Sequence, residues 1–216
     1  SLILPSGYLL LSKGNKDAVI RLAHYGKSKK WKIQGVTGPE KSVLSFASVW
    51  LEGVKKAPLD KKEFMIYSTS CFSFLKGRKP TLLKVVEPSS WPRAQAWTTL
   101  YANEADPPLE SSTLVSMTRS MMLKGNLFLL RKEGVGACAM GGFGRATPRS
   151  FVINEVFVPK ELRGRGYGKE LISGLVGQAA AKGKTDCILF SDYSGPNNLY
   201  DRLGFKKIVK FCEQSF

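Results

Sequence analysis

The segment RGRGYGKELI, residues 163–172, contains the residue types that hold phosphate groups. Its first seven residues include three glycines and three cations, Arg163, Arg165 and Lys169, and a helical pattern follows directly. Glycines let the backbone come close to a ligand, and the first N–H groups of a helix attract negative charge. The segment therefore predicts a site for a ligand that carries more than one negative charge.

Two neighbouring elements must position this segment. The sequence SFVINEVFVP before it has the apolar and β-branched residues of a strand. After it, apolar residues recur on one helical face: Leu171, Ile172, Leu175, Val176, Ala179 and Ala180. The order strand, glycine loop, helix is the arrangement in which backbone N–H groups face a phosphate.

Two other phosphate-binding loops do not fit the spacing. A Walker A loop requires Ser or Thr after its lysine, but Glu170 follows Lys169. A dinucleotide fingerprint requires a third glycine where Lys169 stands. A glycine-rich turn that only caps the helix remains an alternative.

The rest of the chain predicts a mixed α/β fold. Short strands and helices alternate in residues 1–79, with a helix over 39–54 and a strand over 64–75. We place a boundary in LKGRKP, because this segment has no apolar periodicity and ends in proline, and we expect a strand over residues 81–86 directly after it. Helices from residue 91 and over 109–123 come next. Three strands then form an expected antiparallel meander: NLFLLRK, GACAMGGFG and SFVINEVFV.

The glycine segment resembles motif A of the GCN5-related N-acetyltransferases (GNAT). The form VFVPKELRGRGYGKEL contains Arg163-x-x-Gly166-x-Gly168 after a strand. Downstream, CILFSD is similar to the family's next strand, and NNLYDRLGF is similar to its motif of an aromatic residue followed by Gly-Phe. Two motifs in the same order make the resemblance specific.

The resemblance implies a fold and a cofactor. The GNAT acyl-CoA N-acyltransferase fold would cover residues 80–216, with residues 1–79 as an additional N-terminal α/β region packed on it. Acetyl-CoA would be the cofactor, with its pyrophosphate on the backbone amides of the loop. The implied cofactor-binding residues are Val156, Phe157, Val158, Arg163, Gly164, Arg165, Gly166, Tyr167, Gly168, Lys169 and Asn197.

One subgroup of the family has an α/β region ahead of the catalytic domain and a W-x-x-x-[FY]-x-x-E pattern, which Trp97, Tyr101 and Glu104 resemble. Two positions depart from the family pattern. Tyr193 stands where an asparagine is common, so the contact to the pantetheine arm falls to Asn197 or is lost. Val152 stands where some members have a catalytic carboxylate.

Acetyl transfer from a thioester needs a neutral amine, a polarised carbonyl and a proton for the departing thiolate. The resemblance assigns the proton to Tyr200, and the backbone N–H of Val156 is expected to polarise the carbonyl. Glu155 and Glu104 are the candidate bases, and water held by Asn154 is the alternative. Alternation along the strand predicts that Glu155 points away from Asn154 and Val156 and faces solvent.

Composition limits the other partners. The chain has 33 Lys and Arg against 17 Asp and Glu, a net charge of +16, and 15 of these cations lie in residues 1–80. Such a charge favours an anionic partner, here an acceptor with a negative group beside its amine. A solvated basic surface is an equal alternative, because the lysines are dispersed.

Metal and triad chemistry are not indicated. The single histidine, His24, and four separated cysteines fit no zinc spacing and no Ser-His-Asp arrangement. Cys138 and Cys187 lie in apolar runs and are expected to be buried thiols. No stretch reads as a membrane span or signal peptide, so we expect a cytoplasmic protein.

The sequence therefore predicts an acetyl-CoA-dependent N-acetyltransferase that transfers acetyl to a primary amine by direct attack. The alternatives are a non-catalytic acyl-CoA-binding module and a basic nucleic-acid-associated protein. The second alternative lacks any recognisable nucleic-acid motif.

Overall fold

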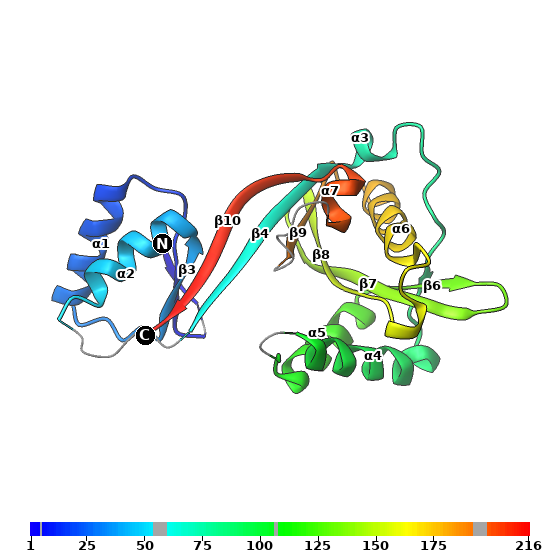
Figure 1. Ribbon diagram of the computed structural model, residues 1–216, viewed down its shortest axis with the longest axis horizontal. Helices are drawn as coiled ribbons and strands as arrows, with labels where there is room; N and C mark the ends of the chain where they lie inside the picture. The colour runs from blue at the N-terminus through cyan, green and yellow to red at the C-terminus, as the bar shows by residue number, and fades with distance from the viewer. Residues whose placement is uncertain (5, 54–59, 106–107, 192–197) are drawn as a thin grey trace. The chain divides into compact units, whose positions relative to one another are not determined.

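The computed structural model describes residues 1–4, 6–53, 60–105, 108–191 and 198–216 (Figure 1). The chain divides into two compact units. Unit 1 comprises Ser1–Ile66, Ser191–Gly195 and Lys207–Phe216, and unit 2 comprises Tyr67–Phe190 and Pro196–Lys206. None of the helices in the described ranges is long and apolar enough to cross a membrane.

Unit 1 is built on a mixed sheet. Its strand order is β1 (Leu2–Ile3), β2 (Tyr8–Leu10), β3 (Gly35–Pro39), β10 (Lys206–Ser215) and β4 (Lys61–Ser70). Strand β3 is parallel to β2 and antiparallel to β10. Strand β3 lies very close to its two neighbours at Gly35, where a Cβ would lie 2.4 Å from the Tyr8 ring and 2.5 Å from the Gln214 carbonyl oxygen. Only glycine fits between these two groups.

Two helices complete the core of unit 1. In α1 (Lys16–Ser28), the Asn15 side chain accepts a hydrogen bond from the Asp17 N–H at 2.8 Å, which satisfies one unpaired donor of the first turn. The helix expected over 39–54 is α2 (Glu40–Trp50), which Pro39 directly precedes. The buried residues that pack together are Leu9, Leu11, Val19, Ala23, Val36, Val43, Phe46 and Cys212.

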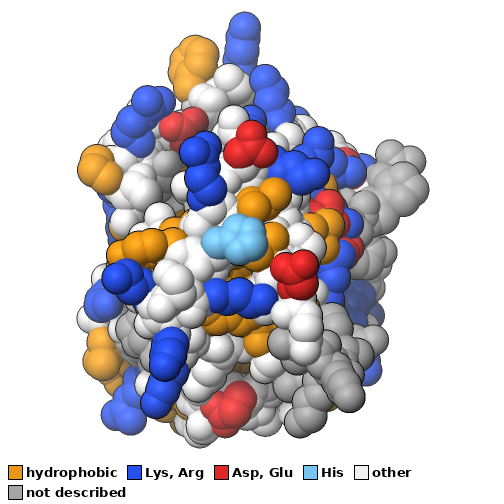
Figure 2. Space-filling view, turned by 90° about the vertical axis from the view of Figure 1, so that its left-hand side faces the viewer, with side chains coloured by type: hydrophobic (Ala, Val, Ile, Leu, Met, Phe, Trp, Pro, Cys, Tyr) orange, Lys and Arg blue, Asp and Glu red, His pale blue; other side chains and the backbone are white. Residues whose placement is uncertain are grey.

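Lys and Arg side chains are scattered over the face shown in Figure 2, with acidic and apolar side chains between them. This matches the dispersed lysines of the sequence. The histidine on this face is His24, which is exposed.

Unit 2 contains the predicted meander. The strand order is β4, β9 (Asp186–Ser191), β8 (Ser150–Phe157), β7 (Gly136–Ala146), β6 (Leu127–Lys132) and β5 (Lys84–Val85). Strands β6, β7 and β8 are antiparallel neighbours, as predicted, and β9 is parallel to β8. The expected α/β fold with a mixed sheet is therefore confirmed.

Helices cover both faces of this sheet. Helix α6 (Tyr167–Ala181) connects β8 with β9, and α4 (Trp91–Glu104) and α5 (Ser111–Leu123) precede the meander. A Cβ at Gly141 would meet Leu171 of α6, and a Cβ at Gly142 would meet Met121 of α5. Because successive strand residues point to opposite faces, α6 and α5 lie on opposite sides of the sheet (Figure 1).

Two expectations about this region differ from the structure. The strand expected over 64–75 ends at Ser70, because Ser70 Oγ accepts from the Ser73 N–H and caps the short helix α3 (Cys71–Leu75). The strand expected at residues 81–86 is only two residues long.

The compact units divide inside β4, between Ile66 and Tyr67, and unit 1 includes most of the last strand. The division into an N-terminal α/β region over residues 1–79, packed on the core, and a domain over 80–216 stays a prediction.

Candidate functional site

The glycine loop lies between the end of β8 and the start of α6. A short 3-10 turn, η2 (Lys160–Leu162), leads into it, and Gly166 is the N-cap of α6. Gly164 and Gly166 have φ values of +78° and +83°, which side chains rarely adopt. A Cβ at either glycine would meet no atom of the described residues within 4 Å, so this part of the structure leaves open space in front of both.

The first turn of α6 has no side-chain cap. The first hydrogen bond of the helix runs from the Glu170 N–H to the Gly166 carbonyl oxygen at 3.1 Å. The N–H groups before Glu170 therefore have no partner within the helix, and the helix dipole adds positive potential at the same point. This geometry suits an anion such as a pyrophosphate.

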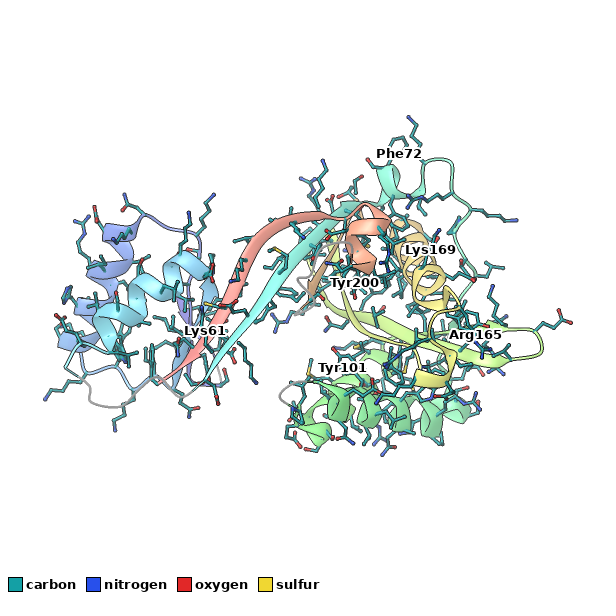
Figure 3. The ribbon with its side chains drawn as sticks, viewed as in Figure 1. Lys61, Phe72, Tyr101, Arg165, Lys169 and Tyr200 are labelled. Atoms are coloured by element: carbon teal, nitrogen blue, oxygen red, sulfur yellow. The ribbon has the colours of Figure 1, made fainter. Side chains whose placement is uncertain are left out.

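The three cations of the loop have different surroundings. Arg163 forms an ion pair with Glu104 of α4, donates from Nε to the Val158 carbonyl oxygen at 2.8 Å, and lies over the Phe157 ring. Arg165 and Lys169 are exposed, and the ion pairs of the described residues do not include them (Figure 3). The positive charge near the loop thus comes from Arg165 and Lys169, while Arg163 anchors the loop to α4.

Strands β8 and β9 separate beside the loop. They pair in parallel from Ser150 with Asp186 to Ile153 with Leu189. Strand β8 continues to Phe157, and within the described residues its pairing with β9 does not continue. Among the described residues, 154–157 thus have no strand pairing on this side, where an extended ligand could hydrogen-bond to the backbone.

Strand β8 has a bulge at Glu155. Met140 of β7 pairs with Phe157 and Gly142 pairs with Asn154, so β8 has one more residue than β7 over this stretch. Glu155 has a φ of +54°, one of two positive values among the described non-glycine residues. A bulge with such a residue redirects a side chain and is common beside active sites.

The side chain of Glu155 is buried between two helices. It is 6% exposed, and its Oε2 accepts hydrogen bonds from Thr118 Oγ1 at 2.5 Å and from Thr98 Oγ1 at 3.5 Å. Its Oε1 is buried and has no hydrogen-bond partner among the described residues. The expectation that Glu155 faces solvent was wrong, because α4 and α5 cover this side of β8.

Burial changes the acidity of this carboxyl group. It raises the pKa of Glu155 to about 6, although the hydrogen bonds from Thr118 and Thr98 act in the opposite direction. A carboxylate with this pKa is ionised at neutral pH but close enough to it to exchange protons. A buried, perturbed carboxylate with an unpartnered oxygen is typical of a functional site.

Tyr200 lies on the short helix α7 (Leu199–Leu203), next to the start of α6. Leu199 is 3.4 Å from the position of a Cβ on Gly168. The buried Asn198 caps α7 by accepting from the N–H groups of Tyr200 and Asp201, and its Nδ2 donates to the Tyr67 hydroxyl at 2.6 Å. The Tyr200 ring packs on Tyr67, with ring centroids 5.5 Å apart. Helix α7 therefore lies against the start of α6, and Tyr200 is on this short helix (Figure 3).

The other predicted residues have simpler positions. Phe157 is buried and packs on Trp97 and Tyr101 of α4. Val156 is half-buried on β8, and Val158 is half-buried directly after the strand ends. Glu104 is exposed at the end of α4, and its carboxylate forms the ion pair with Arg163. Asn197 and Tyr193 lie outside the described residues.

Sequence reasoning missed Thr98, Thr118, Tyr67 and Asn198. Thr98 and Thr118 are polar residues on the buried faces of amphipathic helices, and this pattern is the signal by which they could have been found. Tyr67 gives no comparable signal, because tyrosine is common in buried strands.

The four cysteines are buried free thiols, which confirms the expectation for Cys138 and Cys187. In the described part of the chain, no group of three or more His, Cys, Asp or Glu side chains is arranged to hold a metal ion.

The comparisons with known proteins identify a domain family over the region that contains this site. Residues 124–207, from the end of α5 to the start of β10, match the family described as an acetyltransferase (GNAT) domain. The match contains the bulge, the glycine loop and Tyr200. No curated protein matches the sequence.

Solved structures of low sequence identity share the fold. A GNAT-family acetyltransferase from Colwellia psychrerythraea has a TM-score of 0.63 and 14% identity, over 93% of this chain and 72% of that chain. A GCN5-related N-acetyltransferase from Sphaerobacter thermophilus has a TM-score of 0.61 and 15% identity, over 99% and 74%. One from Kribbella flavida has a TM-score of 0.56 and 15% identity, over 95% and 77%.

Residues 124–207 are therefore similar to the acetyltransferase (GNAT) domain family. The chain shares its fold with solved GNAT acetyltransferases.

Proposed function

We propose that this protein is an acetyl-CoA-dependent N-acetyltransferase that transfers acetyl directly to a primary amine. The observation that carries this proposal is the loop at Gly164 and Gly166. Both glycines have left-handed backbone conformations at the start of α6, whose first turn has no side-chain cap among the described residues. They lie directly beside the point where the pairing of β8 with β9 ends. A pyrophosphate and an extended arm joined to it fit these two adjacent features.

The residues that would hold acetyl-CoA follow from this geometry. The backbone amides of residues 164–169 bind the pyrophosphate, and Arg165 and Lys169 attract it. The open side of β8 at Val156 binds the arm and its carbonyl oxygen through backbone hydrogen bonds. Asn197 stays a prediction for the pantetheine arm. Bound there, acetyl-CoA supplies an acyl group activated as a thioester.

The chain's own residues then handle the protons. Glu155 accepts a proton from the amine, because its carboxylate is ionised at neutral pH and its Oε1 lacks a partner among the described residues. Tyr200, on the short helix α7 that lies against the start of α6, donates a proton to the departing sulfur. Glu104 positions Arg163 and thereby the loop, in place of the catalytic role that its sequence position suggested.

The buried carboxylate favours an enzyme over a non-catalytic acyl-CoA-binding module. Burial of an ionised carboxylate costs folding free energy, and such a group is typical of a site that acts on a substrate. The acceptor stays open. The net charge of +16 favours an amine that also carries a negative group.

Calorimetric titration with acetyl-CoA tests the proposal. The wild-type chain is expected to bind, and Gly166→Asp is expected to abolish binding by placing a carboxylate where the phosphates belong. Gly134→Asp is the matched control: Gly134 also has a positive φ, +72°, and open space around it, but it lies in the β6–β7 turn. Absence of wild-type binding at millimolar ligand, or equal loss in both variants, refutes the proposal.

The reaction is then followed by thiol release with a panel of amines. Release that depends on an amine supports transfer. Binding without release with any amine favours the non-catalytic alternative.

A further inference from the structure

The carboxylate of Glu155 is held asymmetrically. Two hydroxyl groups from two different helices meet its Oε2, Thr98 from α4 and Thr118 from α5. Its Oε1 is equally buried and has no partner among the described residues. One oxygen is therefore anchored, and the other remains able to accept a proton.

Each threonine hydroxyl has one proton and more than one acceptor. Thr118 Oγ1 lies 2.8 Å from the Leu114 carbonyl oxygen, four residues earlier in α5, as well as 2.5 Å from Oε2. Thr98 Oγ1 lies 3.0 Å from the Ala94 carbonyl oxygen and 3.1 Å from Thr118 Oγ1. The hydroxyls can therefore donate toward the carboxylate or toward their own helices.

This choice of acceptors suits both charge states of Glu155. With the carboxylate ionised, Thr98 donates to Thr118 and Thr118 donates to Oε2. With the carboxyl group neutral, both threonines can turn to the carbonyl oxygens of Ala94 and Leu114 without leaving a hydroxyl unpaired. A change of protonation thus leaves each threonine hydroxyl with an acceptor for its proton.

We propose that Thr118, supported by Thr98, is a positioning residue that anchors Oε2 of Glu155, so that Oε1 is the atom that accepts the proton of the acceptor amine. This inference rests on the proposed function. In the step, the N–H bond of the amine breaks, its electron pair stays on nitrogen, and an O–H bond forms at Oε1.

The shift in the pKa of Glu155 comes from uncharged groups. Burial raises the pKa of Glu155 and the two threonines lower it. The charged residues on the elements packed against it do not contribute to this shift: Arg93 and Glu104 on α4, Arg119 on α5, Arg145 on β7, and Lys169 and Glu170 on α6. Removal of one hydroxyl should therefore act on Glu155 directly.

The test compares Thr118→Val with Thr118→Ser in the full chain. Valine keeps the shape of threonine but cannot donate, so the ionised carboxylate loses a hydrogen bond and the pKa of Glu155 rises by about 1 to 2 units. Serine keeps the hydroxyl and should leave the pKa near its wild-type value. Thr99→Val is the matched control, because Thr99 bonds only the Gln95 carbonyl oxygen among the described residues.

The first readout needs no substrate. Carbon-13 NMR of labelled glutamate carboxyl groups follows the titration, with the Glu155 signal assigned by its loss in Glu155→Gln. An unchanged titration in Thr118→Val, or an equal shift in Thr118→Ser, overturns the proposal.

The second readout is the dependence of kcat on pH. In Thr118→Val, the acidic limb of the kcat profile should shift to higher pH by as much as the NMR titration does. In Thr118→Ser, the limb should lie at its wild-type pH. A limb that does not move while the titration does also overturns the proposal, since Glu155 then accepts no proton in the reaction. Absence of transfer by the wild type counts against the proposed function instead, and the NMR titration still reports the anchoring.

Discussion

Glu155→Gln should change stability in a way that depends on pH. Burial raises the pKa of Glu155 from 4.5 to about 6 in the folded chain. Between these two values the unfolded chain has released this proton while the folded chain keeps it. The folded state then binds more protons, so the free energy of unfolding falls as pH rises through this window.

The magnitude follows from the size of the shift. A shift of about 1.5 pKa units corresponds to about 2 kcal/mol, which is present below pH 4.5 and lost above pH 6. Glutamine has a similar shape but does not titrate. The difference in free energy of unfolding, variant minus wild type, should therefore increase by about 2 kcal/mol between pH 4 and pH 7.5. Turnover should fall in the same variant, because the proton acceptor is missing.

Urea unfolding at several pH values, followed by tryptophan fluorescence and circular dichroism, measures this difference. Glu133→Gln removes the same formal charge from an exposed position and serves as the control. A difference that is constant with pH, or that decreases as pH rises, would show that the folded state does not favour the neutral form of Glu155. The argument for a buried proton acceptor would then fail.

Three further substitutions test the other elements of the site and the core. Glu104→Gln should raise the KM for acetyl-CoA about two- to fivefold with little change in kcat, because an exposed ion pair that only positions Arg163 is worth at most about 1 kcal/mol; a fall in kcat alone would make Glu104 catalytic. Tyr200→Phe should lower kcat by about 100-fold or more and leave the Kd for acetyl-CoA unchanged by calorimetry, as a proton donor acts in the transition state; unchanged turnover would assign the ring to packing on Tyr67. Gly35→Ala should destabilise the protein by about 1–3 kcal/mol in thermal unfolding, because its Cβ would overlap the Tyr8 ring and the Gln214 carbonyl. Gly14→Ala, where the added Cβ finds ordinary contacts, should change stability little, and equal effects would contradict the packing argument.

Local sequence determined the glycine-loop half of the candidate site. The glycine loop, the helix that follows it and the apolar face of α6 are all properties of residues 163–181, and each depends on neighbours a few positions away. The meander is also local, because turn residues and alternation within each strand specify β6, β7 and β8. These features were predicted for that reason.

Only the tertiary structure decided which carboxylate is buried. Glu155 meets Thr98 and Thr118, which lie 57 and 37 positions away in the chain, and Arg163 meets Glu104 at a separation of 59. Alternation along a strand gives the side to which Glu155 points, but it does not show that two helices from earlier in the chain cover that side. The bulge, the hydroxyl donors and the raised pKa all result from that packing, so the two candidate bases could not be ranked from the sequence alone.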